Sequence, residues 1–216
     1  ASGFADGQRA YQRKDYAEAA RLFYSTLAVT QGQERAKAEL ALAESLKNLG
    51  LNYSAAYFYA RIVAQGSGND FYRTAFESLG NLNAQTPLGR SSVTSLFERK
   101  IDPLTVPPAA RGFFFYFRGV EFFERKNNAG AKAEFERVPS GNPYYPKAQY
   151  YLGVISTVSK DLDGALNAFN RANRAATTED LKQLSLLNIG RVYYERKDYN
   201  RAFSYYAQIP RNSDLW

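Results

Sequence analysis

The sequence of 216 residues contains no cysteine, no histidine and no methionine. Without cysteine the chain can form neither disulfides nor thiolate metal sites, which is compatible with an oxidising or a reducing compartment. Without histidine it lacks the commonest general base, the usual activator of nucleophiles and the commonest metal ligand, so any chemistry would fall to carboxylates, lysine and tyrosine. We therefore expect no enzyme, and no catalytic, cofactor-binding or metal site.

Long hydrophobic runs are also absent. The most apolar segment, "RGFFFYFRGVEFFERK" (residues 111–126), is interrupted by Arg111, Arg118, Glu121 and Glu124, whereas a membrane-spanning helix needs about 18 uninterrupted apolar residues. The sequence therefore predicts no transmembrane segment. It begins with "ASGF" rather than with methionine, which would suit cleavage of a signal peptide. We expect an exported, periplasmic protein, with the cytoplasm as the alternative.

The chain carries an excess of positive charge, with a formal net charge of +7 and a pI near 9.5. Its lysines and arginines are scattered along the sequence rather than gathered in one tail. Such an excess favours acidic partners without naming one. Nucleic-acid binders usually show denser and more one-sided charge. Basic clusters such as Arg171 with Arg174 are therefore interpreted as solvated helix faces, and no nucleic-acid partner is expected.

An internal repeat runs through the whole sequence. Its units centre on small residues that follow one another at spacings of 37, 36, 39, 34 and 37, namely Ala19, Ala56, Ser92, Ala131, Ala165 and Ala202. Twelve residues before each centre stand Gly7, Glu44, Gly80, Gly119, Gly153 and Gly190. Four residues after each centre stand Phe23, Ala60, Leu96, Phe135, Phe169 and Tyr206. Glycine in a helix costs about 1 kcal/mol relative to alanine, so its recurrence predicts close packing of two helices, glycine against alanine, with the later apolar residue beside them.

The segments between these positions predict turns. Short polar stretches such as "RKD" (13–15), "RKNN" (125–128) and "SKD" (159–161) separate two helices within a unit. Looser segments such as "GSGND" (66–70), "IDPLTVPP" (101–108) and "VPSGNPYYP" (138–146) separate the units. No convincing period-two strand pattern occurs. The fold class expected is all-α.

The best-matched units resemble the tetratricopeptide repeat, a helix-turn-helix unit of about 34 residues. They are "YFRGVEFFERKNNAGAKAEFERV" (116–138), "YYLGVISTVSKDLDGALNAFNRA" (150–172) and "LNIGRVYYERKDYNRAFSYYAQIP" (187–210). The resemblance implies an α-solenoid, a right-handed superhelix of about six units, that forms a single domain over residues 1–216. Residues 1–101 are divergent, residues 107–216 match well, and a proline-rich junction lies at 102–108.

In this family the first helices of the units line a concave groove where partners dock. The aromatic segment 111–126 is interpreted as the first helix of the fourth unit. Burial by a neighbouring helix is the more frequent role of such an aromatic stripe, and a place in the groove is the alternative. Transfer of the family's groove register to this sequence gives Gln8, Tyr11, Gln12, Ala41, Ser45, Asn48, Phe113, Tyr116, Val120, Phe123, Lys147, Tyr150, Val154, Leu187, Arg191 and Tyr194.

Tyrosine and arginine are enriched at binding hot spots, so the leading hypothesis is a protein-interaction scaffold, in a bacterial envelope assembly, that binds a partner segment with apolar anchors and acidic flanks. The lysine and asparagine clamp with which some family members grip chaperone tails is not reproduced, because Asn48, Lys147 and Arg191 lie in separate units. Self-assembly into a homo-oligomer is the second hypothesis. Nucleic-acid binding is the third.

Overall fold

A computed structural model gives the structure of residues 2–86, 88, 96 and 100–215. This part of the chain contains helices and turns but no β-strand, as the sequence predicts. The chain divides into two compact units, residues 1–114 and 115–216. Each unit is described by itself.

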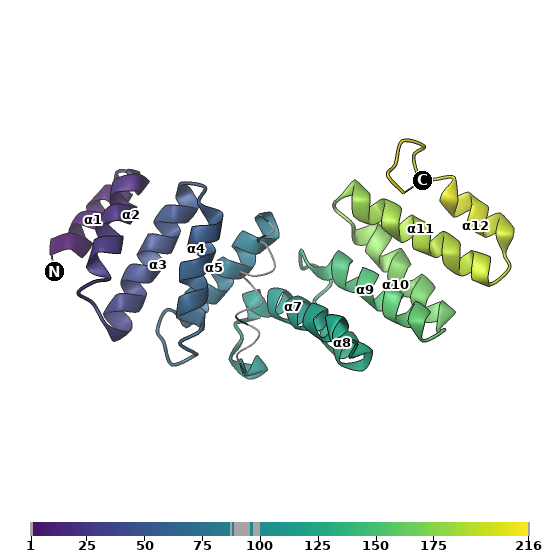
Figure 1. Cartoon of the computed structure of the whole chain (residues 1–216), viewed down its shortest axis with the longest axis horizontal. Coiled ribbons are helices and arrows are strands. Elements are labelled where there is room, and N and C mark those ends of the chain that lie inside the picture. Colours follow the sequence, from purple (N-terminus) through teal and green to yellow (C-terminus); the bar gives the residue numbers. More distant parts are fainter. Residues whose placement is uncertain (1, 87, 89–95, 97–99, 216) are drawn as a thin grey trace. The chain divides into compact units, whose positions relative to one another are not determined.

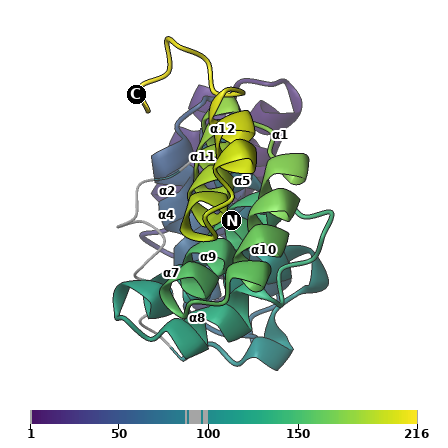
Figure 2. The same cartoon turned by 90° about the vertical axis from the view of Figure 1, so that its right-hand side faces the viewer.

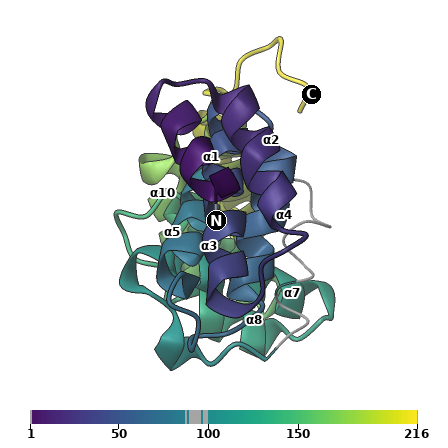
Figure 3. The same cartoon turned by 90° about the vertical axis from the view of Figure 1, so that its left-hand side faces the viewer.

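The first unit is a row of helices in which each packs on the next. Figure 1 shows this order, and Figure 3 views the row from its N-terminal end, with α1 and α2 side by side in front. Two short 3-10 helices, η1 (Pro103–Thr105) and η2 (Pro108–Ala110), precede α7 (Arg111–Glu124), whose first turn completes the unit. The row consists of α1 (Ser2–Gln12), α2 (Tyr16–Thr26), α3 (Gly32–Asn48), α4 (Asn52–Val63) and α5 (Tyr72–Gln85). Ser92, the expected centre of the third repeat, lies outside the described residues.

The second unit begins within α7, at Phe115, and also consists of paired helices. Contacts join α8 to α9, α9 to α10, α10 to α11 and α11 to α12, and Figure 2 shows α11 and α12 side by side at its C-terminal end. The remaining helices are α8 (Asn128–Phe135), α9 (Tyr145–Val158), α10 (Leu162–Ala175), α11 (Glu179–Glu195) and α12 (Tyr199–Tyr206). The expected helix pairs are therefore confirmed wherever the chain is described.

One turn structure closes four of the helix hairpins. In the first, Lys14 adopts a left-handed backbone conformation with φ of 62°. Its N–H donates to the carbonyl of Tyr11 at 2.9 Å, and the N–H of Asp15 donates to the carbonyl of Ala10 at 3.0 Å, which ends the first helix in a Schellman motif. The Asp15 carboxylate then accepts from the N–H of Glu18 at 3.2 Å and caps the second helix.

The same pairing of lysine with a capping residue recurs at Lys126 and Asn127, Lys160 and Asp161, and Lys197 and Asp198. In the second repeat Gly50, with φ of 76°, takes the left-handed position. The dipeptide "KD" or "KN" is thus the sequence signal of the hairpin, and it satisfies backbone groups at two helix ends at once.

The left-handed lysines predict a stabilising substitution. A side chain in this conformation costs on the order of 1 kcal/mol, part of which is offset when glycine makes the unfolded chain more flexible. We expect Lys160→Gly to raise the free energy of unfolding by about 0.5 kcal/mol in urea titrations. The control Lys132→Gly, within α8, should lower it by about 1 kcal/mol. If both variants lower the free energy of unfolding equally, the left-handed conformation of Lys160 does not cost the turn any stability.

The repeated glycines pack against aromatic rings rather than against the alanines. A Cβ built on Gly153 would lie 2.6 Å from ring atoms of Phe169, which are its nearest neighbours. The alanine centres are nevertheless buried, at Ala19, Ala56, Ala131, Ala165 and Ala202. Alanine and ring are four residues apart and share one helix face, so the spacing alone does not choose between them. Only the ring is large enough to reach across to the other helix. The same contact joins Gly7 to Phe23, Gly119 to Phe135 and Gly190 to Tyr206.

The second repeat reverses this arrangement. Glu44 replaces the glycine and Ala60 replaces the aromatic residue, so a side chain has been gained on α3 where a ring has been lost on α4. The neighbouring Tyr59 is fully buried, and its hydroxyl donates to Glu44 Oε1 at 2.5 Å. The departure from the repeat pattern is therefore a paired exchange that keeps the helices packed.

Candidate partner-binding groove

A hollow of about 380 Å³ lies between α1 and α3 in the first unit. Four of its residues occupy positions that the sequence assigned to the groove, namely Gln8, Tyr11, Gln12 and Ala41. We call this hollow the α1–α3 groove. Its lining consists of Phe4, Gln8, Tyr11, Gln12, Phe23, Lys37, Leu40, Ala41, Glu44 and Phe71.

Tyr11 and Asn48, both predicted groove residues, are joined by a hydrogen bond. The side-chain amide of Asn48 donates to the Tyr11 hydroxyl at 3.1 Å and to the backbone carbonyl of Glu44 at 2.8 Å. The Tyr11 ring meets Tyr16 edge-on at 5.2 Å between centroids. Because its hydroxyl acts as the acceptor toward Asn48, the hydroxyl hydrogen remains available for a second partner. The bond holds a tyrosine in a fixed position at one end of the groove.

The lining of the groove includes aromatic side chains and one lysine. Phe4 packs on Phe23 with ring centroids 5.2 Å apart, and Lys37 Nζ lies 5.0 Å from the centroid of Phe4. Sequence reasoning did not select Phe4, Lys37 or Phe71. The repeat register carries no information on Phe71, which lies in the turn before α5.

Glu44, on the groove wall, connects three helices. Its Oε1 accepts from the hydroxyls of Tyr59 on α4 and Ser78 on α5, at 2.5 and 3.4 Å, and its Oε2 pairs with Lys47 at 2.5 Å. Burial, together with the hydrogen bond to the Glu44 carboxylate, raises the pKa of Tyr59 well above its ordinary value. The phenol therefore stays protonated and keeps donating to Glu44 throughout the physiological pH range.

Some of the predicted residues of the second unit lie on α9 and α11. Lys147 and Arg191 are exposed, and Tyr194 is exposed and meets Tyr199 edge-on. Tyr150 is half-buried, and its hydroxyl accepts from the side-chain amide of Asn188 at 3.1 Å. This repeats the link between tyrosine and asparagine seen at Tyr11. Asn188 was not predicted, because it lies one residue away from the register that was carried over.

Four predicted groove residues come from the aromatic segment, and one of them, Val120, is half-buried. Phe113 is 1% exposed and meets the Phe76 ring edge-on, and Tyr116 is 8% exposed and stacks on Tyr144. Phe123 is half-buried against Tyr151. The side chains of Phe113 and Tyr116 thus lie in the core, the role that the sequence analysis placed first for this stripe. Their hydrophobic surface packs within the protein rather than lining a groove.

Among the described residues, no group of three acidic side chains is arranged to hold a metal ion. None of the helices in that part of the chain is both long enough and apolar enough to cross a membrane.

Comparison with solved structures identifies the fold. The chain matches the crystal structure of the APC/C hetero-tetramer Cut9–Hcn1 over 99% of its own length and 40% of that chain, with 18% identity and a TM-score of 0.50. The matched proteins contain tetratricopeptide repeats. The chain has the tetratricopeptide-repeat fold. No family model matches the sequence, and no curated protein matches it significantly.

Two further structures align with the chain. MamA matches 93% of this chain and 90% of its own, at 16% identity and a TM-score of 0.36. BtubC from P. vanneervenii matches 94% of this chain and 75% of its own, at 18% identity and a TM-score of 0.33. The fold assignment rests on the Cut9–Hcn1 match and on the repeat pattern itself.

Proposed function

We propose that the protein is an interaction scaffold whose α1–α3 groove binds a segment of a partner protein. The observation that carries the proposal is the combination of apolar and hydrogen-bonding residues in one hollow. Phe4, Leu40 and Phe71 offer surface for apolar anchors, while Tyr11 and Lys37 offer donors. Burial of apolar anchors supplies affinity, and a few placed polar groups supply orientation.

The partner segment expected has apolar anchors and acidic flanks. Lys37 lines the groove, and the chain as a whole has a net charge of +7. We further propose that the scaffold serves an assembly in a bacterial envelope. The absence of cysteine is compatible with that compartment, as it is with a reducing one.

Selection of phage-displayed random peptides on the full chain tests the groove. We expect the selected peptides to combine aromatic or aliphatic residues with aspartate or glutamate. Lys37→Glu should weaken their binding by at least about tenfold, because it places like charges together. The control Lys132→Glu changes the net charge equally but lies on α8, and it should bind as the parent does. Equal binding by both variants, with unchanged helical circular dichroism, would refute the groove.

A second candidate function is self-association through α12. Phe203 is 72% exposed, whereas Leu166, at the same position of the preceding repeat, is 8% exposed and packs with Ile189 and Val192 of α11. Tyr199 lies one turn from Phe203 and is also exposed. A second copy of the chain could cover this face. In that case the molar mass from light scattering rises with concentration, and Phe203→Glu abolishes the rise. A constant mass would exclude the second candidate.

A further inference from the structure

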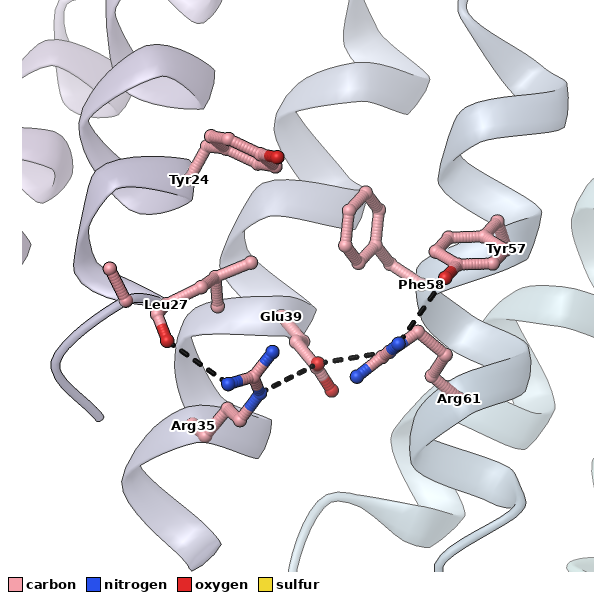
Figure 4. A pocket seen from close by; sticks show the side chains of 8 residues that line it. Tyr24, Leu27, Arg35, Glu39, Tyr57, Phe58 and Arg61 are labelled. Carbon is pink, nitrogen blue, oxygen red and sulfur yellow. Dashed lines mark hydrogen bonds and ion pairs between the residues drawn. The ribbon is translucent and has the colours of Figure 1, made fainter. Parts of the chain in front are cut away.

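A second hollow, of about 420 Å³, opens among α2, α3 and α4. Figure 4 shows side chains that line it: Tyr24 from α2, Leu27 directly after α2, Arg35 and Glu39 from α3, and Tyr57, Phe58 and Arg61 from α4. We call it the α2–α4 pocket. Glu39 is two residues from both Lys37 and Ala41 of the groove, which is about 200° around a helix. The pocket and the groove therefore use opposite faces of α3.

Two arginines in the pocket share one buried carboxylate. Glu39 is fully buried, and its Oε1 accepts from Arg35 Nε at 3.3 Å and from Arg61 Nε at 3.1 Å. Arg35 also donates to the Leu27 carbonyl at 3.1 Å, and Arg61 to the Tyr57 hydroxyl at 3.2 Å, as Figure 4 shows. One negative charge thus faces two positive charges, and the pocket keeps an excess of one positive charge.

The way the arginines meet Glu39 leaves part of each guanidinium available. A guanidinium carries five N–H donors and binds a carboxylate most strongly through two parallel hydrogen bonds. Here each arginine reaches Glu39 through Nε alone, and Nη2 of each has no acceptor among the described residues. The arginine side chains are 40% and 41% exposed. One arginine would be enough to neutralise the charge of Glu39. The second arginine therefore adds a positive charge and N–H donors that a structural ion pair does not need.

Exposed aromatic side chains line the same pocket as the two arginines. Tyr24 is 64% exposed and Tyr57 is 56% exposed, and the Arg61 guanidinium lies 5.6 Å from the centroid of the Tyr57 ring. A free inorganic anion or a small carboxylate would cover little of this aromatic surface. A polypeptide segment can cover it while it places one acidic side chain between the arginines.

We propose that the α2–α4 pocket binds the side-chain carboxylate of an acidic residue in a partner protein's segment. The Nη groups of Arg35 and Arg61 donate to this carboxylate, and the residues next to it in the partner lie against Tyr24 and Tyr57. The site is separate from the α1–α3 groove. It does not depend on the function proposed for that groove.

Arginine side-chain NMR on the full chain tests the site. The probes are a capped peptide with two glutamates flanking a tyrosine, the same peptide with glutamines, and free glutarate. We expect the glutamate peptide to shift the Nε–Hε signals of Arg35 and Arg61, and to bind at least about tenfold more tightly than the glutamine peptide or glutarate. Equal binding of the glutamine peptide, or no shift with millimolar glutamate peptide, would overturn the proposal. Equal binding of glutarate would overturn the assignment to a polypeptide segment.

Three variants place the binding on the pocket. Arg61→Lys keeps a positive charge beside Glu39 but lacks the planar guanidinium group. It should therefore weaken binding of the glutamate peptide by about tenfold while the chain stays folded. Tyr24→Ala changes an exposed side chain and should weaken binding of the glutamate peptide several-fold. Lys37→Glu, in the α1–α3 groove, should leave unchanged the affinity that is read from the Arg35 and Arg61 signals. Loss of binding in Lys37→Glu but not in Arg61→Lys would show that the peptide binds the groove instead, and would overturn the proposal.

Discussion

Phe169→Ala is expected to lower the free energy of unfolding by about 3–5 kcal/mol, because it empties a buried site that a large ring fills. Phe169 is buried against Gly153, and its ring lies 5.6 Å from that of Tyr150 between centroids. Urea unfolding followed by circular dichroism measures the change. The control is Phe203→Ala, which removes the same side chain from an exposed position on α12 and should change stability by less than about 0.5 kcal/mol.

The reciprocal change, Gly153→Ala, should lower the free energy of unfolding by about 1–3 kcal/mol, because the new methyl group overlaps the Phe169 ring. In the double variant Gly153→Ala/Phe169→Ala the methyl group enters space that the ring has left. We therefore expect the double variant to be more stable than the sum of the single effects predicts, by at least about 1 kcal/mol. The second repeat already combines a side chain at Glu44 with a small residue at Ala60. If the two changes in the free energy of unfolding simply add, then Gly153 is not required to make room for the Phe169 ring.

The double substitution Arg35→Gln/Arg61→Gln, which removes both pocket arginines, is expected to lower the free energy of unfolding by about 3 kcal/mol. The double substitution leaves Glu39 buried without a counter-charge, and breaking a buried ion pair costs about 3–5 kcal/mol. The lower end applies because solvent reaches both arginines and weakens the interaction.

The comparison that isolates the buried charge adds Glu39→Leu to the same variant. This triple variant should recover most of the lost stability, since no unpaired carboxylate remains. As a control, Arg73→Gln breaks the exposed pair with Glu77 and should cost less than about 1 kcal/mol in the same urea titration. If the triple variant is no more stable than the double, the loss comes from arginine packing rather than from the charge of Glu39.

The sequence predicts the helix pairs because their signals are local and repeated. The spacing of glycine, alanine and aromatic residues marks each pair, and "KD" or "KN" marks the turn. The identity of the glycine's neighbour could not be read from spacing, since Ala165 and Phe169 share one face of α10 and only the size of the ring decides.

The candidate sites were predicted less completely. Tyr11 and Asn48 follow from the register that lines the groove, and the structure links them by a hydrogen bond. Phe71 belongs to a turn outside any register, so the pattern gives no indication of it. The α2–α4 pocket depends on Glu39 and Arg61, which are 22 residues apart on different helices. Charged residues at such a distance are common in helical repeats, and only the full burial of Glu39 makes this pair unusual.

The hairpin turn has a consequence for how the protein folds. Its hydrogen bonds join residues at most five positions apart, as from Asp15 to Ala10 and from Asp198 to Tyr193. Each helix pair can therefore close without waiting for distant parts of the chain, and sequences dominated by such local contacts fold fast. Assembly can start at any of these hairpins and spread to its neighbours, so a lesion in one pair need not prevent another from forming.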